Sequence, residues 1–212
     1  MKNRLLILIF FCAHTLVKAQ IVNQQTSEGV CDESGVYYKD TENFLPQFEG
    51  TWRHVSDTME LTVKFRKKAM MPYQVLNKNC SYDFLVGEMK LVLNGLEIIN
   101  SLQDLDVNHS NVFLYNLFGF SKYTYTLLPS SPEFPPHVER IHLTYNEKQN
   151  NDLCLAADFI MRIIDVNSQP QLIVKKIFTT PPCGDHRYNA NQTSTSTQFY
   201  LPDGTYTCIK ID

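Results

Sequence analysis

The sequence predicts an all-β fold: an antiparallel β-barrel or barrel-like sandwich with a short N-terminal arm. Residues 58–66 alternate polar and apolar side chains, the period of two expected when one strand face lies in a core and the other in water. The pair Asn94-Gly95 separates two apolar runs and is the strongest short signal of a hairpin. About nine or ten such runs follow one another with turn residues between them, as in barrels and sandwiches.

Residues 1–19 are expected to be a signal peptide and not part of the fold. Lys2 and Arg4 precede a mostly apolar run over 5–17, and Val17-Lys18-Ala19 ends in a small-residue cleavage site. The apolar run is shorter than the roughly 20 residues of a membrane-spanning helix, which disfavours the alternative of an uncleaved anchor. The residues before Cys12 are too bulky for a lipoprotein signal. We therefore predict export to the periplasm or the outside, with no lipid anchor and no transmembrane segment.

The mature chain would begin at Gln20 and is long enough for one domain with a core. We expect an N-terminal arm with one helical turn over 20–47 and a single β-barrel domain over 48–212. Loss of Lys2, Arg4 and Lys18 with the signal changes the formal charge from −3 to −6. No basic stripe remains, so nucleic acid and anionic membranes are disfavoured as partners.

The first elements are expected to close one end of the barrel. Asp40 is expected to cap a helical turn that Pro46 limits, so that the apolar side chains beside it pack on the barrel end. Trp52, the only tryptophan, is predicted to be a buried plug at that end. Gly50 would let the backbone pass close to packed neighbours.

The remaining strands are assigned from alternation and turn residues. The first two predicted strands are 59–65 and 82–93, with a break in the pattern at 67–72 and a turn at Asn94-Gly95. Further strands are predicted over 96–99, 112–120, 122–127, 140–145, 153–165 and 170–178. The last predicted element is a hairpin of 199–201 with 205–211. The apolar spacing in 153–165 also fits a helix. Polar residues dominate 179–197.

Five cysteines follow residue 19, and an oxidising compartment would pair some of them. We expect a Cys183–Cys208 bridge, because it would tie the polar segment 179–197 to the last strand. Cys80–Cys154 is the next plausible pair, and Cys31 is then the odd thiol. Spacing alone does not select among the possible pairings.

Four stretches of the sequence resemble those of a known family. They are Tyr37-Tyr38-Lys39-Asp40, Phe48-x-Gly50-Thr51-Trp52, Leu85-Val86-Gly87-Glu88 and Asn94-Gly95-Leu96-Glu97. They are similar to secreted proteins of Bacteroidota-type bacteria that are known only as a domain of unknown function, chiefly over residues 36–102. The resemblance implies export and an all-β domain, and it implies no activity. Gly50-x-Trp52 also resembles the first strand of lipocalins, although the chain has no evident C-terminal helix.

Metal and catalytic motifs are incomplete in this sequence. Cys183-Gly184-Asp185-His186 lacks the partner pair of a zinc site, and His137 and His142 would point to opposite strand faces. A calcium-loop start at Asp104-x-Asp106-x-Asn108 lacks the glycine and the bidentate glutamate that follow in such loops. The nucleophile, zinc-protease and phosphate-loop signatures do not occur. We expect no metal or cofactor, and we expect solvated carboxylates at Glu49, Glu60, Glu88 and Glu97.

The leading functional expectation is an exported non-catalytic barrel that encloses a small apolar ligand. The alternative is a structural or protein-interaction module with a filled core that acts through its loops. A third possibility is an enzyme whose site is assembled from residues distant in sequence, which clustered titratable residues in a cleft would indicate. The sequence indicates neither the ligand nor a protein partner.

Overall fold

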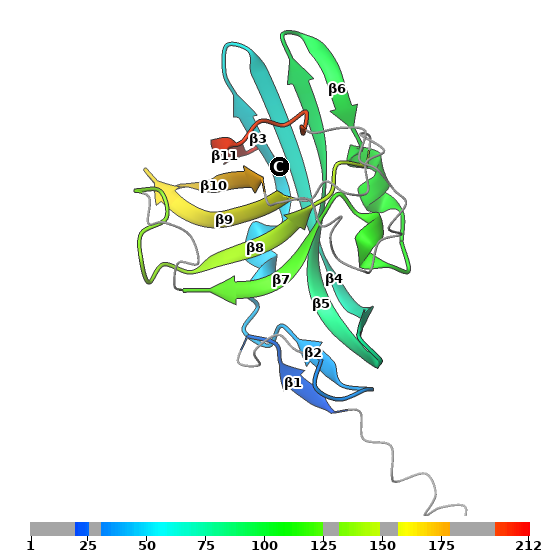
Figure 1. Cartoon of the computed structure of the whole chain (residues 1–212). Coiled ribbons are helices and arrows are strands. Elements are labelled where there is room, and N and C mark those ends of the chain that lie inside the picture. Colours follow the sequence, from blue (N-terminus) through cyan, green and yellow to red (C-terminus); the bar gives the residue numbers. More distant parts are fainter. Residues whose placement is uncertain (1–19, 26–30, 125–131, 149–156, 179–197) are drawn as a thin grey trace, which may run out of the picture.

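The computed structural model describes residues 20–25, 31–124, 132–148, 157–178 and 198–212, so the expected signal peptide 1–19 lies outside the described residues (Figure 1). The strands are β1 (Ile21–Asn23), β2 (Tyr37–Lys39), β3 (Gly50–Val55), β4 (Met59–Val75), β5 (Lys78–Leu93), β6 (Leu96–Asn100), β7 (Leu117–Tyr123), β8 (Arg140–Tyr145), β9 (Ala157–Val166), β10 (Gln169–Phe178) and β11 (Gly204–Lys210). The described helices are short 3₁₀ segments: η1 (Leu45–Phe48), η2 (Leu102–Asp106) and η3 (Val112–Leu114).

Eight of the strands close an antiparallel barrel, which confirms the predicted fold class. The order around the barrel is β3, β4, β5, β7, β8, β9, β10 and β11, and β11 pairs back with β3. Closure removes the free edges that an open sheet of this size would present. Strands β1, β2 and β6 lie outside this ring and extend the same sheet.

The barrel interior is filled with the chain's own side chains. Leu61, Val63 and Phe65 of β4 are buried, as the alternation of this strand predicted. Gly87 of β5 lies against the ring of Phe65, and a Cβ at Gly87 would be 2.5 Å from Cδ1 of that ring. Because protein interiors are close-packed, a contact of this kind leaves no room for a larger residue at Gly87.

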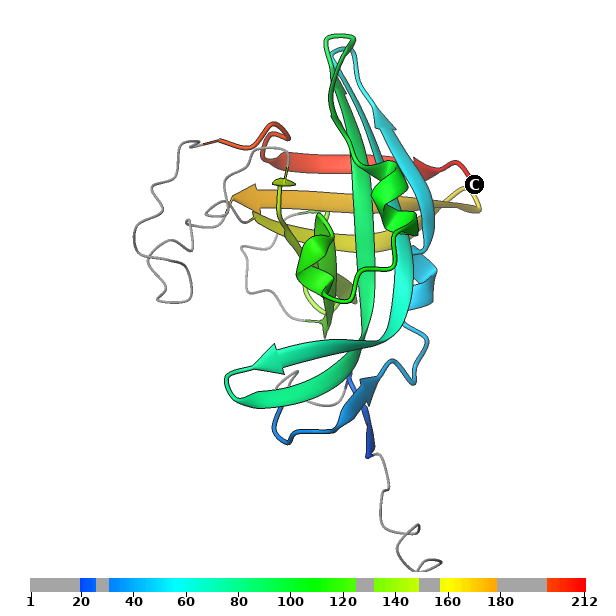
Figure 2. The same ribbon diagram turned by 90° about the vertical axis from the view of Figure 1, so that its right-hand side faces the viewer.

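Strands β4 and β5 form a long hairpin that contributes side chains to two apolar clusters. Figure 2 shows this hairpin running past the barrel and bending away from it. On β5, Leu85 and Met89 face the barrel, whereas Phe84 and Val86 face a second cluster outside it. The outer cluster consists of Cys31, Val36, Tyr38, Met71, Cys80, Tyr82, Phe84, Val86, Leu105, Val112, Tyr115 and Phe118.

The predicted break at 67–72 is wrong, because β4 continues to Val75 through a β-bulge. The register with β5 shifts between Lys68 and Met71, and Met70 has a φ of 56° there. A bulge adds one residue to one strand and bends it. Residues 67–72 therefore mark the bend of the hairpin and not the end of β4.

Two other predicted elements differ from the structure. The predicted strand 112–120 begins with η3, because the side chain of Asn111 accepts a hydrogen bond from the backbone of Phe113 and starts a turn there. Strand β7 spans the predicted boundary between 112–120 and 122–127, and residues 125–127 of the second predicted strand lie outside the described part of the chain. The predicted hairpin between 199–201 and 205–211 is also wrong, because β11 pairs with β10 and β3.

Other local predictions agree with the structure. Asn94 and Gly95 have φ values of 50° and 80°, and they join β5 to β6. Such positive φ values suit the tight turn of a hairpin. The ambiguous segment 153–165 is a strand from Ala157 onward, and its first residues lie outside the described part of the chain.

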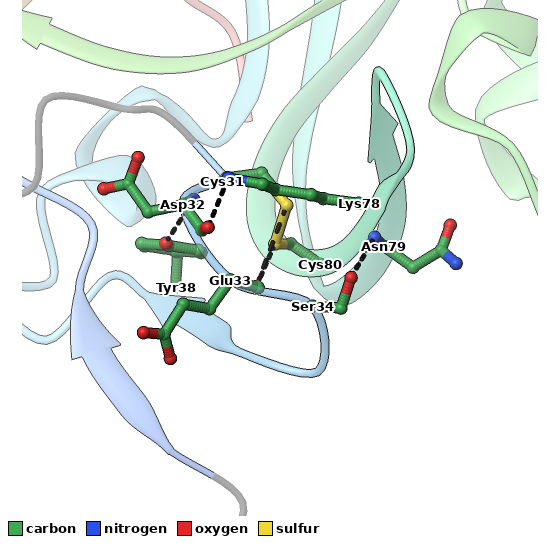
Figure 3. The surroundings of a disulfide bond; sticks show 8 residues. All are labelled: Cys31, Asp32, Glu33, Ser34, Tyr38, Lys78, Asn79 and Cys80. Atoms are coloured by element: carbon green, nitrogen blue, oxygen red, sulfur yellow. Dashed lines mark hydrogen bonds between the residues drawn. A yellow bond between two sulfur atoms is a disulfide. The ribbon is translucent and has the colours of Figure 1, made fainter.

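The disulfide joins Cys31 to Cys80, with their Cα atoms 6.0 Å apart (Figure 3). The expected Cys80–Cys154 pair is therefore wrong, and Cys31 is not the odd thiol. Cys208 is a buried free thiol, which contradicts the expected bridge to Cys183. Cys154 and Cys183 themselves lie outside the described residues.

The fold of the N-terminal arm explains this pairing. Strand β2 lies parallel to β5 and pairs with it at Ser81 and Tyr82, which brings the arm beside the end of β5. Figure 3 shows Asn79 donating its backbone N–H to the Ser34 hydroxyl, and Gly35 in turn donates to the Asn79 carbonyl at 2.8 Å. These bonds hold the two cysteines within bridging distance.

Candidate functional site at the Tyr145 end of the barrel

The Trp52 end of the barrel, where β3 begins, is closed by η1. Asp40 accepts the backbone N–H groups of Phe44 and Leu45 at 2.9 and 3.0 Å, ahead of the helix. The helix itself begins at Leu45 and contains Pro46 in its first turn, so the expectation that Pro46 limits a turn starting at Asp40 is wrong. Trp52 is 1% exposed, and its indole N–H donates to the Phe48 carbonyl at 2.9 Å. These contacts place Trp52 at one end of the barrel, where the sequence analysis expected a plug.

Gly50 has the role of close approach that the sequence suggested. Its φ is +116°, and a Cβ there would be 2.6 Å from Cε of Lys210. The Lys210 ammonium in turn lies 5.3 Å from the centre of the Trp52 ring system. This end is thus sealed by apolar packing with one cation over it.

A buried ionic cluster attaches the arm to the bend of the β4–β5 hairpin. Asp83 accepts hydrogen bonds from the Tyr37 hydroxyl, from Met70 N–H at 3.1 Å and from Asp40 N–H at 3.2 Å. The Lys67 ammonium lies 3.1 Å from both Asp40 and Asp83. Burial by itself raises the pKa of Asp83, but the donors Tyr37, Met70 and Lys67 together hold that pKa below its usual value.

Glu88 is fully buried, which corrects the expectation that this carboxylate is solvated. It accepts the Asn116 backbone N–H at 3.1 Å and the Asn116 side-chain amide at 2.6 Å. That amide also donates to the Ser101 hydroxyl, and Lys148 approaches Glu88 at 3.5 Å. Burial raises the pKa of Glu88 despite these partners. The segment 101–116 covers the strand face that alternation alone assigns to water.

The opposite, Tyr145 end is where β8 and β10 finish and β11 begins. Residues 199–203, which we call the strap, cross this end. Glu147 anchors the strap by accepting Tyr200 N–H at 2.9 Å and Leu201 N–H at 3.3 Å. Glu147 also accepts the Tyr145 hydroxyl at 2.7 Å, and Leu201 is completely buried.

A lysine lies beneath the strap, on the inner face of the barrel. Lys176 follows Leu172 and Val174 at the inward positions of β10, and it is 2% exposed. Its ammonium is 2.7 Å from the Asp203 carboxylate and 4.2 Å from the centre of the Phe199 ring. The same ring stacks on Tyr145 with centroids 5.3 Å apart.

Two further polar side chains complete the Tyr145 end. The Tyr206 hydroxyl donates to the Pro202 carbonyl at 2.6 Å, and burial raises the pKa of Tyr206 to about 12. His54 lies edge-on to the Tyr206 ring, with centroids 5.5 Å apart. The two ends of the barrel therefore differ: at the Trp52 end the charged groups Lys210 and Asp212 lie over apolar packing, whereas at the Tyr145 end an ammonium, Lys176, is itself buried among the aromatic rings.

Sequence reasoning missed this cluster. The available signal was Lys176, which is two residues after Val174 and four after Leu172 and therefore shares their strand face. Asp203 and Phe199 were assigned to a hairpin, so their approach to Lys176 was not anticipated. Asn94 and Gly95 lie in the turn between β5 and β6 and take no part in the cluster.

The fragments of metal motifs in the sequence come together at no metal-binding group in the described residues. Among residues 20–25, 31–124, 132–148, 157–178 and 198–212, no three His, Cys, Asp or Glu side chains are grouped to hold a metal ion. Asp106 of the calcium-like stretch pairs instead with Arg66 at 2.9 Å. The Cys183–His186 fragment lies outside the described residues. The described part of the chain also has no helix with the length and apolar character to span a bilayer.

Comparison with known families assigns residues 1–210 to one family, described as "Family of unknown function (DUF6705)". This match covers nearly the whole chain and agrees with the resemblance to a domain of unknown function. No curated protein and no solved structure matched the chain.

Proposed function

Because this chain belongs to the DUF6705 family, a family of unknown function, we propose a role from its own geometry. We propose an exported, non-catalytic binding protein that takes a small organic ligand at the Tyr145 end of the barrel. The observation that carries this proposal is the buried Lys176, an inward-facing cation beneath the strap. A few polar groups set among aromatic rings are typical of small-molecule sites.

Export is supported by two independent features. The sequence of residues 1–19 has the charged start, apolar run and small-residue end of a signal peptide. The Cys31–Cys80 disulfide suits an oxidising compartment, as in the periplasm or outside the cell. The motifs of residues 36–102 are similar to secreted Bacteroidota-type proteins, and we infer the same setting for this chain.

The packing of the barrel argues for a ligand at its end and not in its middle. Trp52, Leu61 and Met89 are at most 1% exposed, and Phe65 lies against Gly87. The sequence predicts an apolar ligand enclosed by the whole barrel. Because of this packing, we propose instead a smaller site at one end of the barrel.

A protein-interaction module with a filled core is the second candidate. The observation that favours it is the pair Phe113 and Leu114 of η3, each 48% exposed. A partner on that surface would leave the Tyr145 end unchanged, so the two candidates are distinguishable.

The test is a titration of isotope-labelled protein, residues 20–212, followed by the backbone amide signals in nuclear magnetic resonance spectra. The probes are decanoic acid, 1-naphthylacetic acid, its amide and 1-naphthylmethylamine. At least one probe should shift the amides of Tyr145, Lys176 and Tyr206 and leave that of Trp52 unchanged. If none of the four probes moves the signals of the Tyr145 end, the proposed function is wrong.

A further inference from the structure

We propose that Lys176 and Tyr145 form a subsite for an aromatic carboxylate, and that Phe199 and Asp203 occupy this subsite as an internal substitute. The inference rests on the proposed function and names its ligand class. Its basis is that an aromatic ring and a carboxylate, both from the strap, converge on one buried ammonium. The centre of the Phe199 ring is 4.2 Å from Lys176 Nζ, and Asp203 Oδ1 is 2.7 Å from the same nitrogen.

The strap has attachments besides these two side chains. Glu147 holds it through the backbone amides of Tyr200 and Leu201, and Leu201 is fully buried in the barrel core. Phe199 and Asp203 flank this anchored pair. Their side chains can therefore leave Lys176 by rotation about their own bonds while the anchor remains in place.

The exposure of the partners indicates which groups are replaceable. Lys176 is 2% exposed, whereas the Asp203 side chain is 53% exposed. A carboxylate released from Lys176 would thus return to water at little desolvation cost. Lys176 has no such option, because a buried ammonium without an anion is strongly disfavoured. An exchange of Asp203 for an external anion satisfies both groups.

The residue type at position 176 points to recognition and not to packing alone. Leu172 and Val174 precede it on the inner face, and an apolar residue would continue that row without burying a charge. A cation here selects an anionic head group. Tyr145, which stacks on Phe199, offers the ring face for the aromatic part of the ligand.

The experiment removes the internal substitute and measures affinity for defined probes. In the Phe199→Ala/Asp203→Ala variant, 1-naphthylacetic acid should bind about tenfold or more tightly than to the parent, because the competing state is lost. The uncharged amide of this acid should show no such gain. Binding is measured by titration calorimetry on protein shown to be folded by its melting transition.

Neighbouring lysines provide a matched pair of controls. Lys176→Met in the double-variant background should abolish binding of the acid. Lys175→Met should retain it, because residue 175 lies at the outward position between Val174 and Lys176. If the double variant does not fold, Asp203→Asn replaces it; this variant keeps the shape of the strap and should also favour the acid over the amide.

Two outcomes would overturn the subsite. One is equal affinity of the folded variant for the acid and the amide, and the other is acid binding that survives Lys176→Met. If 1-naphthylmethylamine alone shifts the Tyr145-end amides, the aromatic-carboxylate inference fails while the proposed binding function stands. If no probe reaches this end, both fail.

Discussion

Asp83 and Glu88 lie five positions apart on β5, and each stands where this strand exchanges one edge partner for the next. Along one edge, β5 pairs with β2, then β7, then β6. Asp83 lies between the first two and accepts the N–H groups of Met70 and Asp40. Glu88 lies between the last two and accepts that of Asn116. The two carboxylates thus supply acceptors where the ladder of backbone hydrogen bonds is interrupted.

Asp83→Asn should lower the free energy of unfolding by roughly 3 kcal/mol, as expected when one partner of a buried ion pair is removed. The control is Asp106→Asn, which breaks only the exposed pair with Arg66 and should cost less than about 1 kcal/mol. Urea unfolding at pH 7 measures both. Because the fold lowers the pKa of Asp83, the stability that the Asp83 carboxylate contributes should be lost as the pH falls from the usual aspartate pKa through the lowered one. Equal effects of the two substitutions would contradict the role of Asp83 in attaching the arm to the hairpin.

Glu88→Gln should show the opposite pH dependence. Burial raises the pKa of Glu88, so its proton stabilises the fold below the ordinary pKa and this stabilisation is lost as pH rises through the raised one. Glutamine resembles the protonated form at every pH. Relative to the parent, the variant should therefore gain stability between about pH 4 and pH 7. Chemical unfolding at both pH values measures the difference, and a constant difference would show that the pKa is not raised.

Trp52→Ala should cost about 3–5 kcal/mol, the usual penalty for removing a large buried aromatic side chain. Phe113→Ala removes a ring that is 48% exposed and should cost considerably less. Thermal melts of both variants give the comparison. The parent should also show the blue-shifted fluorescence of a buried indole. Emission typical of a fully solvated tryptophan would refute the position of Trp52 in the core.

Removing the disulfide with Cys31→Ser/Cys80→Ser should cost about 4 kcal/mol in the chain-entropy treatment, because the bridge closes a loop with a sequence separation of 49. The matched control is Cys208→Ser, which alters a thiol outside the bridge. Peptide mapping without reductant should recover Cys31 linked to Cys80. Recovery of Cys80 linked to Cys154 would reverse the assignment.

Local signals in the sequence were sufficient wherever one residue type determines one conformation. Asn94-Gly95 indicated its turn, and Trp52 indicated its end of the barrel. Such features depend on neighbours in sequence, so the rules for turns and for strand alternation predict them.

Features that depend on contacts between segments distant in sequence could not be predicted. Glu88 occupies an outward strand position, and only the later segment 101–116 turns that position into a buried one. Cys31 meets Cys80 because β2 is parallel to β5, which no spacing encodes. The Lys176 cluster likewise needs the strap, for which the sequence predicts the first strand and the turn of a hairpin that does not form.

The two-sided β5 strand has a consequence for how the molecule loses its structure. Phe84 and Val86 belong to the outer cluster, while Leu85 between them belongs to the barrel. Melting the outer cluster would uncover the back of the strand that lines the barrel and leave its backbone hydrogen bonds open to water. We therefore expect the two clusters to unfold together, so that the amides of Phe84, Leu85 and Val86 exchange with solvent only through global unfolding.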